Sequence, residues 1–215
     1  MEKIYIVKKF NEEYAARNDI WDDVPTAVIE NCPWDENGYR PRSEAKVYYT
    51  DEAFHVLLKS FENEIRAVYE NLNDRVCTDS CLEFFINPAP EVDNRYLNFE
   101  FNPLGTLLLG LGKDRYDRKL LELDWRKVFK VKTTVTKENL ESFSGPYWAV
   151  EFTIPFDFLR DIYGTVKFES GRKMKGNFYK CGDETKFPHY LCWNNVINYK
   201  PDFHLSQFFG ELVLE

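Results

Sequence analysis

Alternation of apolar and polar residues constrains the fold of this chain more than any other feature of its sequence. In "YLNFEFN" (96–102), Leu97, Phe99 and Phe101 are separated by single polar residues. Successive side chains of a β-strand point to opposite faces, so this spacing is typical of a strand with one buried face. "CLEFFI" (81–86) follows the same rule, and the chain is therefore expected to pair strands rather than to pack helices.

Further strand candidates recur along the chain, with turn-forming residues between them. They are 45–50, 53–60, 106–112, 128–136, 147–156, 173–181 and 209–215. Helical signal is confined to 63–74 and 156–164. No internal repeat or Ser/Gly/Pro-rich linker divides the sequence, so we expect one domain over residues 1–215. This pattern favours an all-β fold, a β-sandwich with one or two short helices, with a barrel as the alternative.

Charge and composition narrow the range of partners. The 215 residues carry a net charge of −8, and 17% of them are aromatic. Nucleic acids and anionic membranes attract clustered Lys and Arg, so neither is expected as a partner. No stretch approaches the ~20 apolar residues of a membrane span. Aromatic side chains favour strands and also line binding surfaces, which leaves a neutral partner as the expectation.

The cysteines and the N-terminal residues indicate in which cellular compartment the protein is expected. Five cysteines, at positions 32, 77, 81, 181 and 192, form an odd set without a repeated spacing. Such a set is a poor disulfide framework, and it lacks the second pair of a structural zinc site. "MEKIYIVKKF" lacks the apolar run and cleavage site of a signal peptide. We therefore expect reduced cysteines that bind no metal, and a cytoplasmic protein.

Two of the strand candidates place polar side chains together. The segments 81–86 and 96–102 are separated by a nine-residue loop, so they can pair in antiparallel fashion and bring Glu83 toward Asn98 and Glu100. A solvated outer face is one interpretation, but such faces usually also carry Lys, Thr, Ser and Arg. Carboxylates, amides and aromatic rings together suit a sugar, whose C–H face stacks on a ring and whose hydroxyls need polar partners.

The stretch "KFPHYLCWNNV" (186–196) supplies a candidate for the stacking ring. Trp193 is the expected plate, with Tyr190 beside it and His189 as a partner for hydroxyls. The amides of Asn194 and Asn195 are further candidate partners. The alternatives are a tryptophan of the core and a histidine that caps or fills the core.

Six blocks of sequence follow one another along the chain: "TDSCLEFFINP", "RYLNFEFNPLGTLLLG", "WAVEFTIPF", "NFYKCGD", "PHYLCWN" and "PDFHLSQFFGELVL". Together they resemble the family 9-like carbohydrate-binding domains, and the resemblance runs in order from about residue 20 to the C-terminus. These are relatives of the family 9 carbohydrate-binding modules among the DOMON-like β-sandwiches. The resemblance implies a DOMON-like or jelly-roll-like sandwich and non-catalytic binding of a sugar, an oligosaccharide or a glycan end.

The resemblance also implies roles for single residues. Trp193 matches the second of two tryptophans that sandwich the sugar, and Glu83 matches a glutamate that hydrogen-bonds it. The first tryptophan falls at Cys77, so that wall is absent or is supplied by Tyr179 or Phe203. Calcium ions accompany some members of the family, although no calcium ligands can be assigned from this sequence.

Other functions compete with plain sugar binding. Glu83 and Glu100 could serve as the acid and base of a glycan-active enzyme if their spacing allowed it. A Cys–His pair, Cys181 or Cys192 with His189 or His204, is a second catalytic option, and haem binding would rest on Met174 or a histidine. No G-x-S-x-G, P-loop or H-E-x-x-H motif is present. An aromatic face could also anchor a protein partner. We expect a binder rather than an enzyme.

Overall fold

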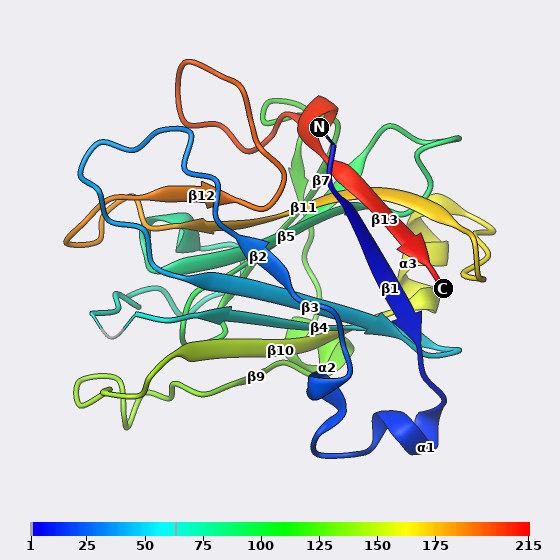
Figure 1. Cartoon of the computed structure of the whole chain (residues 1–215), viewed down its shortest axis with the longest axis horizontal. Coiled ribbons are helices and arrows are strands. Elements are labelled where there is room, and N and C mark those ends of the chain that lie inside the picture. Colours follow the sequence, from blue (N-terminus) through cyan, green and yellow to red (C-terminus); the bar gives the residue numbers. More distant parts are fainter. Residues whose placement is uncertain (1, 63) are drawn as a thin grey trace.

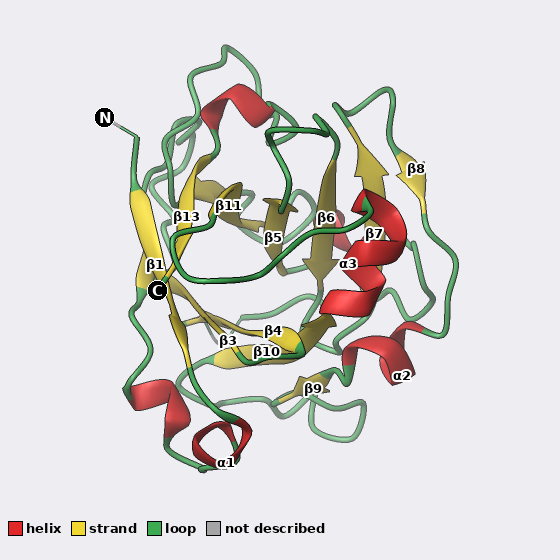
Figure 2. Ribbon diagram, turned by 90° about the vertical axis from the view of Figure 1, so that its right-hand side faces the viewer, coloured by secondary structure: helices red, strands yellow, loops and turns green. Residues whose placement is uncertain are grey.

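In the computed structural model, which describes residues 2–62 and 64–215, two β-sheets pack face to face around an apolar core (Figure 1, Figure 2). The first sheet has the order β8-β7-β6-β5-β11-β13-β1, and β12 pairs with β11 beside this path. Its strands are β8 (Lys119–Leu120), β7 (Leu107–Gly112), β6 (Tyr96–Phe101), β5 (Cys81–Asn87), β11 (Lys173–Cys181), β13 (Gly210–Leu214), β1 (Ile4–Lys9) and β12 (Tyr190–Cys192).

The second sheet continues from β1 in the order β1-β3-β4-β10-β9, with β2 beside β3. Its further strands are β2 (Ala27–Ile29), β3 (Ser43–Tyr49), β4 (Ala53–Ser60), β10 (Trp148–Pro155) and β9 (Lys132–Thr133). The described residues also form three short α-helices and three 3₁₀ turns. These are α1 (Glu12–Ala15), α2 (Trp125–Phe129), α3 (Phe156–Tyr163), η1 (Ile20–Asp22), η2 (Val76–Thr78) and η3 (Ser206–Phe208). The expected sandwich is thus confirmed.

Strand β1 belongs to both sheets. Its first four residues pair in parallel with β13, from Ile4 opposite Glu211, and its last two residues pair in parallel with β3. Figure 1 shows β1 and β13, the two ends of the chain in blue and red, side by side. In Figure 2 the two layers meet at β1, while α2 and α3 lie at the opposite end of the sandwich. Helix α2 also packs against β10.

The core forms where the apolar faces of the two sheets meet. Leu97, Phe99 and Phe101 of β6 all point inward, as the alternation predicts, and none is exposed. The ring of Phe101 lies 4.7 Å from that of Phe152 on β10, which joins the layers. Burying a side chain of this size is worth about 1.5–3 kcal/mol, so these contacts hold the sheets together.

The outer face of the first sheet is apolar as well. A second cluster, with Phe85, Tyr96 and Tyr179 at its centre, is covered by Phe203 and Phe209 from the segment before β13. Phe85 and Tyr96 stack with ring centroids 5.6 Å apart. This face is therefore covered by other parts of the chain rather than by solvent. A site over β5 and β6 would be sheltered by these segments.

Two of the predicted elements differ in the structure. The segment 64–74 is not helical, because Asp79 accepts the backbone N–H groups of Val68 and Tyr69 at 2.9 and 3.1 Å and holds the chain extended; residue 63 lies outside the described part. Val128 and Phe129 end helix α2 instead of starting a strand. The helix 156–164 is confirmed as α3. Within the described part of the chain, no helix has the length and apolar character that a membrane span needs.

Candidate functional site

Glu83 and Glu100 face each other on the outer side of the first sheet. Strands β5 and β6 pair in antiparallel register with Glu83 opposite Glu100, as the nine-residue loop predicts. Both carboxyl groups are buried, with Glu83 2% and Glu100 3% exposed. Two carboxyl groups at one buried position must either bind protons or be neutralised by cations.

Arg118 neutralises Glu100. Its guanidinium donates to Oε1 of Glu100 at 3.0 Å, and the side-chain amide of Asn98 donates to the same oxygen at 2.8 Å. Burial nevertheless raises the pKa of Glu100 to about 6, against the opposing effect of Arg118. Arg118 lies over Gly110 of β7, where an added Cβ would come within 2.5 Å of its Cδ atom. A glycine in that strand therefore makes room for the arginine.

Arg118 also fixes His204. Its guanidinium lies 3.1 Å from Nε2 of His204, and the Tyr96 hydroxyl lies 2.9 Å from Nδ1. Because arginine can only donate, Nε2 accepts and Nδ1 carries the proton of a neutral imidazole. Burial, together with the charges of Arg118 and Arg115, lowers the pKa of His204 to about 2. The imidazole therefore acts as a fixed polar wall rather than as an acid or base near neutral pH.

Glu83 has no such cation against it. The thiol of Cys181 on β11 donates to Oε1 of Glu83 at 3.0 Å. Burial raises the pKa of Glu83 well above its ordinary value, and the neighbouring charge of Glu100 raises it further. Glu83 thus holds a proton under conditions in which Glu100 is ionised, so the pair offers a donor and an acceptor side by side.

These groups line a cavity of about 370 Å³. Its floor is formed by β5, β6 and β11, and its rim by the loops that carry Arg115 and Asp202, which pair at 2.9 Å. A volume of this order is at the lower end of the range for small-molecule sites, roughly 300–1,000 Å³. The lining residues are Cys77, Glu83, Glu100, Arg115, Arg118, Cys181, Asp183, Tyr190, Lys200, Pro201, Asp202, Phe203 and His204.

Two aromatic rings supply apolar wall. Tyr190 and Phe203 both line the cavity, with ring centroids 6.4 Å apart and planes at 69°. Phe203 stacks on Tyr179 at 4.1 Å and 14°, which holds it in place from beneath. Trp34 contacts both rings edgewise or tilted, at 6.3 Å from Tyr190 and 5.7 Å from Phe203. The site therefore combines carboxyl, guanidinium and aromatic groups around one hollow.

Comparison with known families agrees with this chemistry. A family profile described as "Carbohydrate-binding family 9" matches residues 19–214. The chain belongs to carbohydrate-binding family 9. No curated protein sequence matches it significantly.

Solved structures show the same fold as this family 9 chain. A putative carbohydrate-binding protein from Bacteroides uniformis ATCC 8492 superposes with a TM-score of 0.82 at 28% identity, with all of both chains covered. A family 9 module from Caldicellulosiruptor kristjanssonii in complex with glucose gives 0.66 at 15% identity, covering 99% of this chain and 96% of that one. The same organism's module in complex with cellotriose gives 0.64 at 15%, covering 99% and 94%.

The structure corrects the expected position of Trp193. The indole is 4% exposed and lies in the core between the sheets, edge-on to Phe178 at 5.6 Å and to Tyr5 at 6.3 Å. An added Cβ on Gly210 would come within 2.4 Å of the ring, so glycine is required under it. Cys192 and Trp193 point to opposite faces of the first sheet, and it is Cys192 that has the outer face. The prediction that Trp193 shares a surface with the two glutamates is wrong.

His189 is also on the inner side. It is 2% exposed, and its Nε2 accepts from the buried ammonium of Lys180 at 2.7 Å, while Nδ1 contacts the carbonyl of Phe187. Lys180 pairs with Glu62 at 2.9 Å inside the sandwich. Burial and the charge of Lys180 lower the pKa of His189 to about 4. The histidine therefore completes a buried polar network and does not reach the cavity.

The remaining predicted residues support the site from different positions. Glu83, Glu100 and Tyr190 line the cavity directly. Asn98 is fully buried and acts through its bond to Glu100, and Tyr179 lies under Phe203 with its hydroxyl donating to that residue's carbonyl at 3.2 Å. The amide of Asn194 is used within the chain, accepting from the backbone of Lys3 and donating to that of Phe208, while Asn195 is exposed and does not line the cavity.

Sequence reasoning missed the cationic part of the site. Arg115 and Arg118 come from the loop between β7 and β8, which carries no strand or helix pattern. A signal was nevertheless present in "LLLGLG", because Gly110 and Gly112 both lie under that loop. Glycine inside an otherwise apolar strand indicates close approach of another part of the chain. Cys77, at the position of the first sandwiching tryptophan, does line the cavity.

The family resemblance implies that a calcium ion can accompany the fold, so we asked whether the side chains of this chain can bind one. Among residues 2–62 and 64–215, the one group of three or more His, Cys, Asp or Glu side chains close enough to share a cation is Cys81, Glu83 and Cys181. Calcium takes six to eight oxygen ligands. Two sulfurs and one carboxylate do not fit that requirement, so this group is not a calcium site.

Proposed function

We propose that the cavity over β5 and β6 binds the end unit of a glycan without hydrolysing it. The observation that carries this proposal is the joint placement of Glu100, Arg118, Tyr190 and Phe203 around one hollow of about 370 Å³. A sugar presents hydroxyl groups on its edge and C–H groups on its faces. It can therefore use the polar and the aromatic walls at the same time.

Each wall has a defined task in this proposal. The Glu100 carboxylate accepts hydrogen bonds from sugar hydroxyls, and the Arg118 guanidinium donates to hydroxyl oxygens. Asn98 already holds the carboxylate of Glu100, and His204 already holds the guanidinium of Arg118. Little side-chain freedom is therefore lost when the ligand binds. Phe203, held by its stack on Tyr179, offers an apolar surface to the ring of the sugar.

The size of the cavity supports a short ligand or a chain end rather than the middle of a long polymer. The Arg115–Asp202 pair is among the residues that line this cavity of about 370 Å³. The family 9 modules solved with glucose and with cellotriose share the fold and support the same class of ligand. Gluco-oligosaccharides and their monosaccharide units are therefore the first ligands to test.

Calorimetric titration with glucose, xylose and their oligosaccharides tests the proposal. Glu100→Gln should weaken binding about tenfold or more, because a hydrogen bond to a charged group is worth about 1.5–3 kcal/mol. The matched control is Glu151→Gln, which changes a strand carboxylate on the other sheet and should bind as wild type does. No binding to any sugar of the panel, or equal affinity of Glu100→Gln and wild type, would contradict the proposal.

One observation favours a second function, hydrolysis of the bound glycan. Glu83 and Glu100 lie opposite each other, burial raises the pKa of both, and the guanidinium of Arg118 is paired with Glu100. A protonated and an ionised carboxyl group are also the pair that a glycosidase uses. Incubating the protein with the best-bound oligosaccharide and measuring reducing ends over time separates the functions. An increase that Glu83→Gln abolishes would establish the enzyme, and an unchanged oligosaccharide supports the binder.

A further inference from the structure

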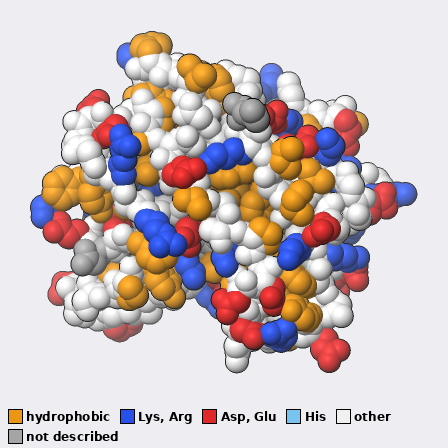
Figure 3. Space-filling view, in the orientation of Figure 1, with side chains coloured by type: hydrophobic (Ala, Val, Ile, Leu, Met, Phe, Trp, Pro, Cys, Tyr) orange, Lys and Arg blue, Asp and Glu red, His pale blue; other side chains and the backbone are white. Residues whose placement is uncertain are grey.

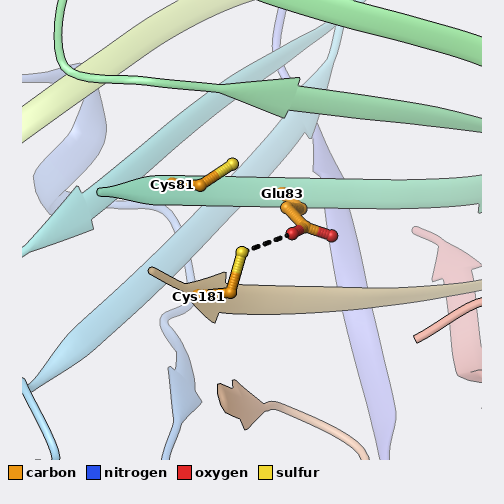
Figure 4. A group of neighbouring side chains, drawn as sticks. All are labelled: Cys81, Glu83 and Cys181. Carbon is orange, nitrogen blue, oxygen red and sulfur yellow. Dashed lines mark hydrogen bonds between the residues drawn. The ribbon is translucent and has the colours of Figure 1, made fainter. Parts of the chain in front are cut away.

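Three metal-ligand side chains converge where β5 and β11 pair at the cavity. Cys81 and Glu83 lie on β5 and Cys181 on β11, with Cys81 directly opposite Cys181 in the strand register. Their ligand atoms all lie within 4.8 Å of one another. Figure 4 shows the Cys181 thiol and the Glu83 carboxyl group pointing toward each other across the gap between the strands, 3.0 Å apart.

Two paired strands position these donors, not a loop. All three side chains project from the outer face of the first sheet, in the residues at which β5 starts and β11 ends. Strand β5 is flanked on its other side by β6, so the backbone under the donors is held from both sides. Donors on regular elements keep their geometry better than donors on loops.

We propose that Cys81, Glu83 and Cys181 form a site for a zinc-like divalent cation, with a fourth coordination position open to the cavity. Zinc binds thiolates at about 2.3 Å and carboxylates at about 2.0–2.2 Å in tetrahedral geometry, which places neighbouring ligand atoms roughly 3.5 Å apart. The observed separations are compatible with that geometry after small side-chain movements. Thiolate ligands favour zinc over calcium or magnesium. For these two cysteines the proposal departs from the expectation that no cysteine binds a metal.

The surroundings suit such an ion. Glu83 and Cys181 line the cavity, which gives the ion a route in from solvent and leaves room for water at the fourth position. The two thiols and the carboxyl group each lose a proton to solvent as the bonds to the metal form. Three anionic ligands around a dication leave one negative charge, and the guanidinium groups of Arg115 and Arg118 line the same cavity to offset it.

Titration of the reduced, metal-free chain with Co²⁺ tests the site without any sugar, so its result is independent of the proposed function. One equivalent should bind, with thiolate-to-cobalt charge-transfer absorption in the near ultraviolet, and Zn²⁺ should displace it. Cys81→Ser and Cys181→Ser should each weaken Zn²⁺ binding by more than the roughly 10–100-fold that loss of an outer-shell partner costs. Cys192→Ser is the matched control, because that buried thiol lies on the same sheet but outside the group.

Glu83→Gln provides a second variant in case a serine variant fails to fold. The change is nearly isosteric, removes the anionic oxygen and should also weaken Zn²⁺ binding at least about tenfold. The proposal is overturned if the wild-type chain binds no Co²⁺, or if affinity is unchanged in every folded variant of the three residues. It is also overturned if Cys81 and Cys181 form a disulfide in place of the metal complex under the reducing conditions of the titration.

Discussion

Trp193, directly after β12, belongs to the core between the sheets. Trp193 packs on Phe178 above Gly210, so its loss leaves a cavity in the core. Trp193→Ala should lower the free energy of unfolding by about 3–5 kcal/mol, measured by urea denaturation. Any protein that remains folded should keep its affinity for sugar. A variant as stable as the wild type but unable to bind sugar would show that the indole is a binding platform after all.

Glu100 should make the stability of the chain depend on pH. Its pKa of about 6 in the folded chain lies above the ordinary value of 4.5, so between these values the folded state binds more protons than the unfolded state. The free energy of unfolding therefore falls by about 2 kcal/mol as the pH rises through this window. The difference in stability between Glu83→Gln and the double variant Glu83→Gln/Glu100→Gln should change by this amount, because Glu83, whose pKa depends on the charge of Glu100, is absent from both proteins. Contributions of His189 and His204 are common to both.

Urea denaturation of the two proteins at several pH values between 4 and 8 measures this difference. A constant difference across the range would mean that the folded chain does not raise the pKa of Glu100. A difference that changes with the opposite sign would mean that Arg118 outweighs burial and holds the carboxyl group ionised at lower pH.

At the scale of single elements, substitutions at two strand glycines are expected to affect sugar binding and folding differently. An added Cβ on Gly110 of β7 would come within 2.4 Å of Oδ1 of the buried Asn98 and 2.5 Å of Cδ of Arg118, so these two side chains would have to shift. An added Cβ on Gly176 of β11 would come within 2.7 Å of the backbone oxygen of Phe85, which cannot move without disturbing the sheet.

Gly110→Ala should therefore displace Arg118 and weaken sugar binding about tenfold, and it should also lower the melting temperature near neutral pH, because buried Glu100 loses its cation. Gly176→Ala is its counterpart and should lower the melting temperature, because the sheet itself must shift. Calorimetry and thermal melts of both variants give the comparison. Equal affinity of Gly110→Ala and wild type would show that the position of Arg118 does not matter for the ligand.

Elements also show where sequence reasoning succeeds and where it fails. Alternation predicts both faces of β5 and β6 and the approach of Glu83 to Glu100, because a strand has only two faces and a short loop sets the pairing. The same alternation cannot say which face of β12 is the core. There the amides near Trp193 indicate a polar surface, although Asn194 in fact satisfies backbone groups of Lys3 and Phe208.

At the scale of the whole molecule, the fold class follows from the sequence but the cavity does not. Its walls come from η2, β5, β6, the loop before β8, β11, β12 and the loop around residue 203, which only the assembled sheets bring together. No residue spacing in the sequence predicts that these segments come together. Arg115 and Arg118 lie in a loop, so they are not part of any strand or helix pattern. A single domain over 1–215 and a cytoplasmic location stay predictions.

The central claim is that sugar occupies the outer cavity of the first sheet and not the Trp193 side. The crystal structure of the chain with the best-binding sugar from the calorimetric panel tests it most directly. We predict density for a sugar ring against Phe203 or Tyr190, with hydroxyl groups within hydrogen-bonding distance of Glu100 and Arg118. A sugar bound elsewhere, with the cavity free of it, would contradict the account.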